Sequence, residues 1–139
     1  MNMKTIFLDF DGVLHVIQAN FEERFSKLYL LEDLAKDFSF EVVISSTWRL
    51  FYDVSSLKEN LKTVGERVVG VTGDSLTGPY ARYLEIKAYA EENNILDWRA
   101  IDDASQEFPE DENRLIECQS NMGIGKKQID VLTSWLISA

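Results

Sequence analysis

The sequence predicts an α/β fold with three layers, in which a mainly parallel sheet of five strands lies between two layers of helices. Short apolar segments rich in β-branched residues alternate with longer segments whose apolar residues recur every three or four positions. Residues 40–46, FEVVISS, are typical of a strand that is covered on both faces. Strands that alternate with helices in this way form parallel sheets with helices on both sides.

The first half of the chain supplies the first three expected strands. Residues 4–10, KTIFLDF, are expected to form a buried strand, residues 40–46 the second and residues 67–72 a short third. A helix is expected over residues 53–64. An amphipathic helix is expected over residues 21–38, because apolar side chains recur there at helical intervals: Phe21, Phe25, Leu28, Leu31, Leu34 and Phe38.

The second half supplies two more strands and two helices. Pro79 suits the first turn of a helix that runs to about Asn93. The segments DWRAIDD at residues 97–103 and NRLIECQ at residues 113–119 are expected to form the fourth and fifth strands. A last helix is expected over residues 126–137, with one apolar face made of Ile129, Leu132 and Leu136.

Length and composition exclude several classes of protein. A chain of 139 residues fits one compact domain, and its net charge of −10 argues against an extensive nucleic-acid interface, which needs a basic surface. The single cysteine, Cys118, excludes an internal disulfide and is expected to be a buried, unreactive thiol. No apolar run approaches the roughly 20 residues of a membrane span. Because the first residues also lack the pattern of a signal peptide, we expect a cytoplasmic protein with no membrane partner.

Polar residues follow three of the expected strands at the point where each strand ends. These segments are FLDFDG, VVISSTWR and RAIDDAS. Taken singly, each has an ordinary explanation as a turn, a helix cap or a solvated loop. Because the carboxyl ends of parallel strands meet at one edge of the sheet, where such folds bind ligands, the three together predict a functional site.

The residue types at these strand ends suit phosphate chemistry. Carboxylates such as Asp9 and Asp103 can share Mg²⁺, which prefers oxygen ligands. A bare carboxylate approaching a phosphate is repelled by about 1 kcal/mol in water and by about 4 kcal/mol at a protein-like dielectric. A bound cation turns that repulsion into alignment, and the hydroxyl and N–H groups after ISST can hold the remaining phosphate oxygens.

Together these segments resemble the haloacid dehalogenase-like (HAD) hydrolase superfamily. The resemblance rests on DFDGVL, on the serine that ends the second strand, on a basic residue that opens a later helix, and on DD after the fourth strand. VVISSTWR is similar to a small capless subgroup that includes HAD domains of RNA-repair proteins. The resemblance implies one Rossmann-like, HAD-like hydrolase domain over residues 1–139, with a minimal cap or none.

Carried onto this sequence, the resemblance implies catalytic roles for the first two aspartates. Asp9 would be the nucleophile that forms an aspartyl-phosphate, and Asp11 would be the general acid and base. Mg²⁺ would be held by the side chains of Asp9 and Asp103 and by the backbone carbonyl of Asp11. Asp102 would be a further metal ligand, acting through a water.

The phosphate-binding groups are left with alternatives. Ser45 directly follows the strand and is the better match for the phosphate-binding hydroxyl, with Ser46 as the alternative. The cation is either Arg82 or Lys87, which lie about 140° apart around one helix and cannot easily face one pocket. Arg82 is preferred, because it lies in the first turn and a guanidinium suits bidentate phosphate contact. The superfamily more often uses lysine, which keeps Lys87 open.

Other polar residues near these segments have two explanations each. His15 is a possible substrate contact, but a hydrogen-bonded loop residue is favoured. Arg49 either reaches the substrate or caps a carboxylate structurally, and Trp48 is expected to pack rather than stack on a ligand. A solvated loop, rather than an extension of the metal site, is expected for the acidic residues Glu107, Glu110, Asp111 and Glu112.

The short intervals between the three segments leave no room for a cap domain. We therefore expect an open site for a phosphorylated partner, either a small molecule or an exposed phosphate on a macromolecule, with a lid supplied by another chain if at all. The leading hypothesis is a Mg²⁺-dependent phosphatase that acts on a monoester. The alternatives are a non-catalytic binding or regulatory domain, or a phosphatase of polynucleotide ends.

Overall fold

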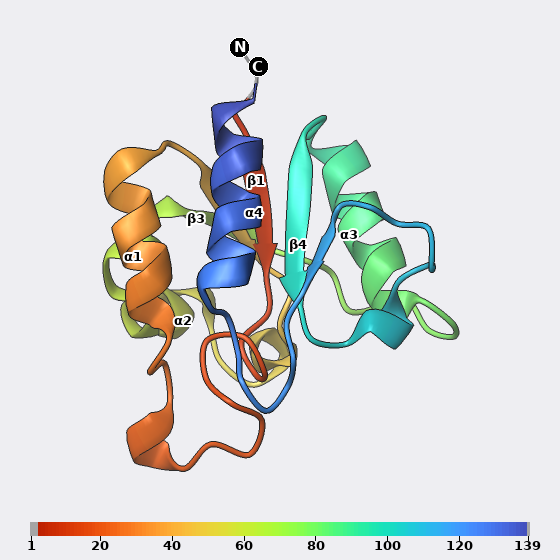
Figure 1. The fold of residues 1–139 in the computed structure, drawn as a ribbon. Coiled ribbons are helices and arrows are strands. Elements are labelled where there is room, and N and C mark those ends of the chain that lie inside the picture. The colour runs from red at the N-terminus through yellow and green to blue at the C-terminus, as the bar shows by residue number, and fades with distance from the viewer. Residues whose placement is uncertain (1–2, 139) are drawn as a thin grey trace.

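A computed structural model, which describes residues 3–138, contains one five-stranded sheet (Figure 1). The strands lie in the order β3-β2-β1-β4-β5, and every pair of neighbours is parallel. This arrangement confirms the predicted Rossmann-like α/β fold. The strands are β1 (Thr5–Leu8), β2 (Glu41–Ile44), β3 (Val68–Val71), β4 (Trp98–Asp102) and β5 (Leu115–Glu117).

Helices cover both faces of the sheet. They are α1 (Leu28–Asp37), α2 (Val54–Asn60), α3 (Ala81–Glu92) and α4 (Lys126–Ile137). In Figure 1, α1 and α4 lie on one side of the strands and α3 on the other. Short 3₁₀ turns connect these elements: η1 (Phe21–Glu23), η2 (Thr47–Leu50), η3 (Lys62–Arg67) and η4 (Ser105–Glu107).

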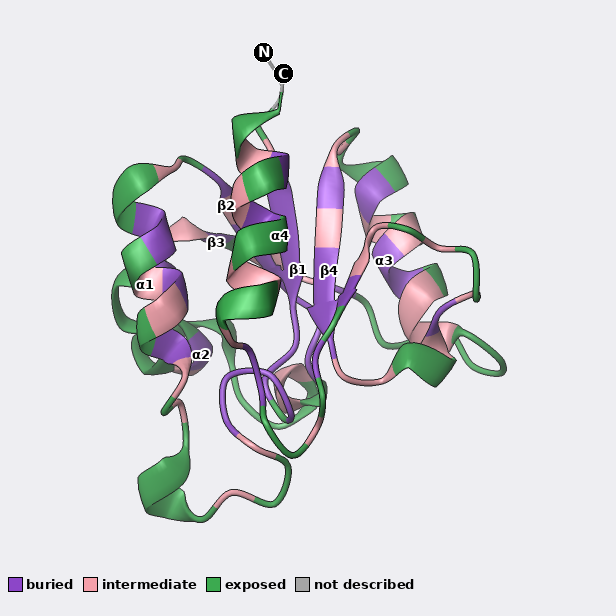
Figure 2. Ribbon diagram, in the orientation of Figure 1, coloured by how far each residue is buried: buried purple, intermediate pink, exposed green. Residues whose placement is uncertain are grey.

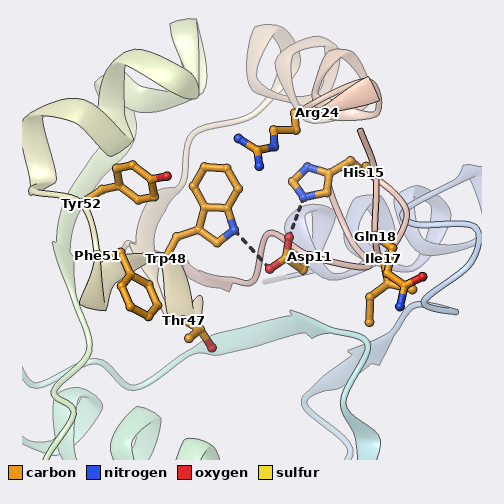
Figure 3. Close-up of a pocket in the computed structure, with 10 residues that line it drawn as sticks. Asp11, His15, Ile17, Gln18, Arg24, Thr47, Trp48, Phe51 and Tyr52 are labelled. Atoms are coloured by element: carbon orange, nitrogen blue, oxygen red, sulfur yellow. Dashed lines mark hydrogen bonds and ion pairs between the residues drawn. The ribbon is translucent and has the colours of Figure 1, made fainter. Parts of the chain in front are cut away.

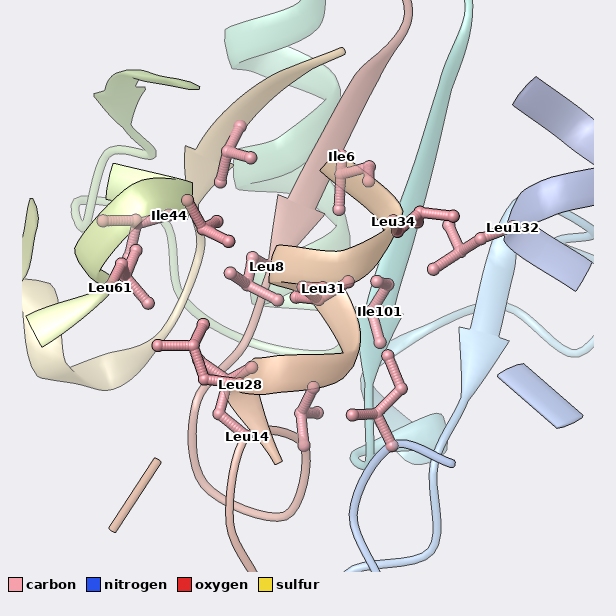
Figure 4. Packing of buried hydrophobic residues seen from close by; sticks show 14 of the residues in the cluster. Ile6, Leu8, Leu14, Leu28, Leu31, Leu34, Ile44, Leu61, Ile101 and Leu132 are labelled. Carbon is pink, nitrogen blue, oxygen red and sulfur yellow. The ribbon is translucent and has the colours of Figure 1, made fainter. Parts of the chain in front are cut away.

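The central strand β1 supplies side chains to both layers of the core. Ile6 and Leu8 pack in one cluster with leucines of α1, α2 and α4 (Figure 4), whereas Phe7 packs against α3 on the other face. This alternation follows from the two-residue period of a strand. Each of the three side chains is at most 1% exposed, and burial of one such side chain contributes about 1.5–3 kcal/mol. Both faces of β1 are therefore anchored, and the strand is buried along its whole length (Figure 2).

The prediction of a helix over residues 21–38 is wrong for residues 21–27. Asn20 caps the 3₁₀ turn η1, and the α-helix begins only at Leu28. Phe25 lies between them with φ of 63°, a left-handed conformation that a right-handed helix does not contain, and its N–H donates to Nδ1 of His15 at 3.1 Å. Phe21 is 83% exposed and does not belong to the core.

Two other helices are shorter than expected, and the last one is confirmed. The helix at residues 53–64 ends at Asn60, and Lys62 then takes a φ of 54° at the start of η3. Helix α3 begins after Tyr80, which has φ of 60°, so Pro79 precedes the helix instead of lying in its first turn. Helix α4 has the predicted bounds, with the predicted apolar face toward the core.

Candidate active site

The three polar segments meet at the carboxyl edge of the sheet. Leu8 is in register with Ile44 of β2 and with Ile101 of β4. The residues that follow, Asp9 and Ser45, therefore lie beside Asp102 at the ends of three adjacent strands. The strand order reverses between β1 and β4, and folds of this class bind ligands at such a switch point.

Three acidic side chains converge at this edge. Asp9, Asp102 and Asp103 each offer a carboxylate oxygen, and these oxygens lie within 4.8 Å of one another. Asp9 is 4% exposed and Asp102 is fully buried. Burial raises the pKa of Asp9 well above 3.8, and the neighbouring charge of Asp102 raises it further. Burial also raises the pKa of Asp102. The cluster therefore holds more negative charge than its surroundings stabilise.

Arg82 is the cation that faces this cluster. Its Nη1 lies 2.9 Å from Oδ2 and 3.0 Å from Oδ1 of Asp102, and 3.6 Å from Oδ2 of Asp9. Burial opposes the charge of Arg82, but the two carboxylates outweigh it and its pKa is raised. Nζ of Lys87 instead lies 5.8 Å from the centre of the Tyr83 ring. The structure thus brings Arg82 to the strand ends and leaves Lys87 on another side of α3.

Asp103 is held by a close backbone approach and by a side chain that the sequence analysis did not identify. Its Oδ2 accepts a hydrogen bond from Oγ of Ser120 at 2.6 Å. A Cβ atom on Gly12 would lie 2.1 Å from the same oxygen, and Gly12 has φ of +79°. Glycine is therefore required at residue 12 both for the turn and for the space that Asp103 fills.

The side chain of Asp11 points to a different set of partners. Its Oδ1 lies 2.7 Å from Nε2 of His15, and its Oδ2 accepts from Nε1 of Trp48 at 3.1 Å (Figure 3). Nδ1 of His15 accepts a hydrogen bond from the N–H of Phe25. In a neutral imidazole the proton is therefore on Nε2, which donates to Oδ1 of Asp11. Asp11 is about half exposed and His15 is buried. His15 therefore positions Asp11, as the hydrogen-bonded interpretation expected.

The hydroxyls after β2 have different environments. Oγ of Ser45 is buried and is the one side-chain polar atom in residues 3–138 found buried without a hydrogen-bond partner. Oγ of Ser46 accepts the N–H of Trp48 and caps η2. Thr47, which the sequence analysis did not single out, accepts from Nη2 of Arg82 at 3.2 Å and lines the cavity over Asp9. Its only sequence signal was its place as the third hydroxyl of ISST.

The contacts of Arg49 agree with the structural one of its two expected alternatives. All five of its N–H groups donate to protein acceptors, which leaves none for a substrate. One acceptor is Oε1 of Glu85 at 3.1 Å. The others are backbone carbonyls, those of Ser45, Ser46, Thr72 and Gly73. The guanidinium thereby ties the end of β2 to the segment after β3.

The remaining polar residues lie outside the acidic cluster. Glu112 pairs with Arg114 at 2.6 Å, which lowers its pKa to about 2, and Glu107 contacts the N–H of Arg82. Burial raises the pKa of Cys118 to about 12, which fits the expected unreactive thiol. Trp48 packs against Phe10 and Phe25, as expected, although it also lines a cavity.

Comparisons with known proteins give one match. Residues 5–129 match the family described as the HAD domain in Swiss Army Knife RNA repair proteins. No curated protein and no solved structure matches the chain. Within residues 3–138, no helix is long and apolar enough to cross a membrane. Since the match covers most of the chain and the fold agrees with it, the chain belongs to this family of HAD domains, within a superfamily of hydrolases.

Proposed function

We propose that the protein is a Mg²⁺-dependent phosphatase that hydrolyses a phosphate monoester through an aspartyl-phosphate on Asp9. One observation carries the proposal. Three carboxylates and one guanidinium meet at the carboxyl edge of the sheet, with Asp9 buried among them. A nucleophilic carboxylate needs neighbours that bring a phosphate to it in spite of its charge, and this set of groups suits that need.

The donor set fits Mg²⁺. All three convergent groups are carboxylates, and a hard cation prefers oxygen ligands. Arg82 engages both oxygens of Asp102, so Asp9 and Asp103, with the backbone carbonyl of Asp11, are the residues that would hold the ion. When bound, the ion would neutralise the carboxylates and stabilise the charge of the transferring phosphoryl group.

The residues of this chain would divide the reaction as follows. A carboxylate oxygen of Asp9 attacks phosphorus, and the bond from phosphorus to the alcohol oxygen breaks as Asp11 donates a proton to that oxygen. Asp11 then accepts a proton from the water that attacks the aspartyl-phosphate, which releases phosphate and regenerates Asp9. Asp11 lines both the cavity over Asp9 and a larger neighbouring cavity, which suits a group that acts on the leaving oxygen.

The phosphate oxygens would be held from the side of β2 and α3. Ser45 has a buried hydroxyl that no group in residues 3–138 satisfies. Thr47 accepts from Arg82, so its own O–H is free to donate to a phosphate oxygen. The guanidinium of Arg82 supplies the positive charge.

The proposal is tested by phosphate release from a panel of monoesters. Wild type should release phosphate with Mg²⁺ and not after chelation. Asp9→Asn should lose at least about 10³-fold in activity, as expected for the loss of a nucleophile. Asp111→Asn, a change of the same type in the exposed acidic loop, should leave the rate unchanged. No release from any ester, or an Asp9→Asn variant as active as wild type, would contradict the proposal.

A second candidate is a phosphatase of polynucleotide ends. The description of the matched family, which names RNA repair proteins, favours it. The net charge of −10 argues against a long nucleic-acid footprint but leaves a terminal phosphate accessible. The panel should therefore include oligonucleotides with a terminal phosphate, and release from these alone would select this candidate.

A further inference from the structure

A second cavity opens beside the catalytic one. The cavity over Asp9 has a volume of about 280 Å³, and its neighbour, which we call the aromatic pocket, has a volume of about 540 Å³. Asp11, Ile17 and Thr47 line both. A monoester whose phosphorus lies at Asp9 would therefore extend its alcohol part past Asp11 into the aromatic pocket.

Three aromatic side chains from one segment form a wall of this pocket. Trp48 lies in η2, Phe51 and Tyr52 follow η2, and all three line the same cavity (Figure 3). The rings of Trp48 and Tyr52 lie 5.2 Å apart at 32°. Phe51 is 76% exposed and has no aromatic partner in the described part of the chain. Leu50 and Tyr52, on either side of Phe51, are also about half exposed, and a run of exposed apolar residues, unlike a single one, is a candidate contact for a ligand.

The charge of the pocket also favours a substrate. The guanidinium of Arg24 lies 5.4 Å from the centre of the Trp48 ring. Within residues 3–138, Arg24 forms no ion pair with a carboxylate. Asp11 on the same lining carries the opposite charge, so the two nearly cancel and the pocket suits a neutral group such as an aromatic ring.

We propose that the aromatic pocket is the leaving-group subsite and that it takes a planar aromatic ring carried by the phosphorylated alcohol. The inference rests on the proposed function for the place of the phosphate. Aromatic side chains and a guanidinium offer flat faces, which stack on a planar ring of any sequence or substitution. Free nucleotides and the terminal nucleotide of a strand share this chemistry. Phe51 and Tyr52 are the specificity-determining residues.

Binding to an inactive protein tests the pocket apart from catalysis. The Asp9→Asn variant with Mg²⁺ is titrated calorimetrically with adenosine 5′-monophosphate and with ribose 5-phosphate. The second compound has a hydroxyl in place of the adenine base. The nucleotide should bind about 5- to 150-fold more tightly, the range expected for one stacked base. Adding both Phe51→Ala and Tyr52→Ala to this variant should abolish the difference in affinity between the nucleotide and ribose 5-phosphate. Adding Tyr29→Ala, which removes an exposed aromatic residue of α1 outside both cavities, should preserve it.

Turnover gives the second measurement. The ratio of kcat/KM for the two esters should favour the nucleotide by the same factor in the wild type and approach one in the Phe51→Ala/Tyr52→Ala double variant. Equal binding and equal kcat/KM for the two esters would overturn the pocket assignment. Ring-dependent binding without any hydrolysis would support the pocket and contradict the proposed phosphatase instead.

A further arm separates the two sources of the ring. The mononucleotide is compared with a trinucleotide that carries the same 5′-phosphate. A higher kcat/KM for the trinucleotide identifies the end of a strand as the source of the ring, and a higher value for the mononucleotide identifies a free nucleotide. Turnover of the preferred compound should fall in the Phe51→Ala/Tyr52→Ala double variant, and an unchanged kcat/KM there would contradict the pocket. If Arg24→Met removes a preference in kcat/KM for the trinucleotide over the mononucleotide, Arg24 contacts the second phosphate of the strand.

Discussion

Two groups of buried charge lie near the carboxyl edge of the sheet, and they are balanced in opposite ways. Arg49 and Glu85 form a pair whose side chains are 8% and 7% exposed, and every N–H of Arg49 has an acceptor. Asp9 and Asp102 instead share the single guanidinium of Arg82, and Asp103 adds a third carboxylate within 4.8 Å of them. The satisfied pair joins parts of the scaffold, and the unsatisfied cluster has a surplus of negative charge that a bound cation would stabilise.

The largest effect on stability is expected at the satisfied pair. Arg49→Ala leaves Glu85 buried without its partner and frees four carbonyls at the ends of β2 and β3, so it should lower the free energy of unfolding by about 3–5 kcal/mol. Urea denaturation measures it. Lys36→Ala, which breaks an exposed ion pair with Asp33, is the control and should change little. A similar small change for Arg49→Ala would show that the pair is not structural.

The next largest effect is expected at Arg82, in activity. Arg82→Ala removes the guanidinium that faces Asp9 and should lower kcat/KM by about 10²- to 10³-fold, as for loss of one charge-stabilising donor. Lys87→Ala on the same helix is the matched control and should retain the wild-type rate, because Lys87 lies against Tyr83. If the two variants exchanged these results, Lys87 would be the phosphate-binding cation.

Metal binding should stabilise the unsatisfied cluster and not the satisfied pair. Mg²⁺ at one hundred times its dissociation constant should stabilise the wild type by about 2.7 kcal/mol through mass action. The gain should vanish in Asp103→Ala and persist in Asp97→Ala, which removes an aspartate at the opposite end of β4. Equal stabilisation of both variants would place the ion elsewhere.

The smallest effect is expected without metal, and its sign depends on pH. Because the pKa of Asp9 is raised in the folded protein, folding favours its protonated form, and the associated stability is present below pH 3.8 and lost as pH rises through the raised pKa. Metal-free Asp9→Asn should therefore be more stable than wild type at neutral pH, where the wild-type carboxylate is buried and charged. The advantage should shrink toward pH 4. An Asp9→Asn variant that is less stable than wild type at neutral pH would show that Asp9 is not destabilised.

The place and order of the strands were predictable because each strand is a local apolar segment, although the observed strands are shorter than expected: β1 covers Thr5–Leu8 of residues 4–10, and β5 covers Leu115–Glu117 of residues 113–119. The start of the first helix was not predictable, because Phe21 and Phe25 continue a helical spacing that the structure interrupts. At the point where the helical spacing is interrupted, the N–H of Phe25 donates a hydrogen bond to Nδ1 of His15, ten residues earlier in the chain. Such contacts between side chain and backbone leave no periodic trace in the sequence.

The site was predictable to the extent that it follows from strand ends. Asp9, Ser45 and Asp102 come together because parallel strands end at one edge. The choice between Arg82 and Lys87 depends on how α3 begins after Tyr80, which only the tertiary structure fixes. The choice for Arg49 depends on carbonyls after β3, and Ser120 reaches Asp103 from the loop after β5, where no motif marks it.

The central claim is that Asp9 is a nucleophile in a metal-dependent site. Fluorine NMR with beryllium fluoride, which mimics a phosphoryl group on a carboxylate, tests it most directly. With Mg²⁺, the wild type and Lys87→Ala should show bound fluoride signals, whereas Asp9→Asn should show none, and chelation should remove the signals. Bound signals of equal intensity in Asp9→Asn, or signals that persist without Mg²⁺, would contradict the account.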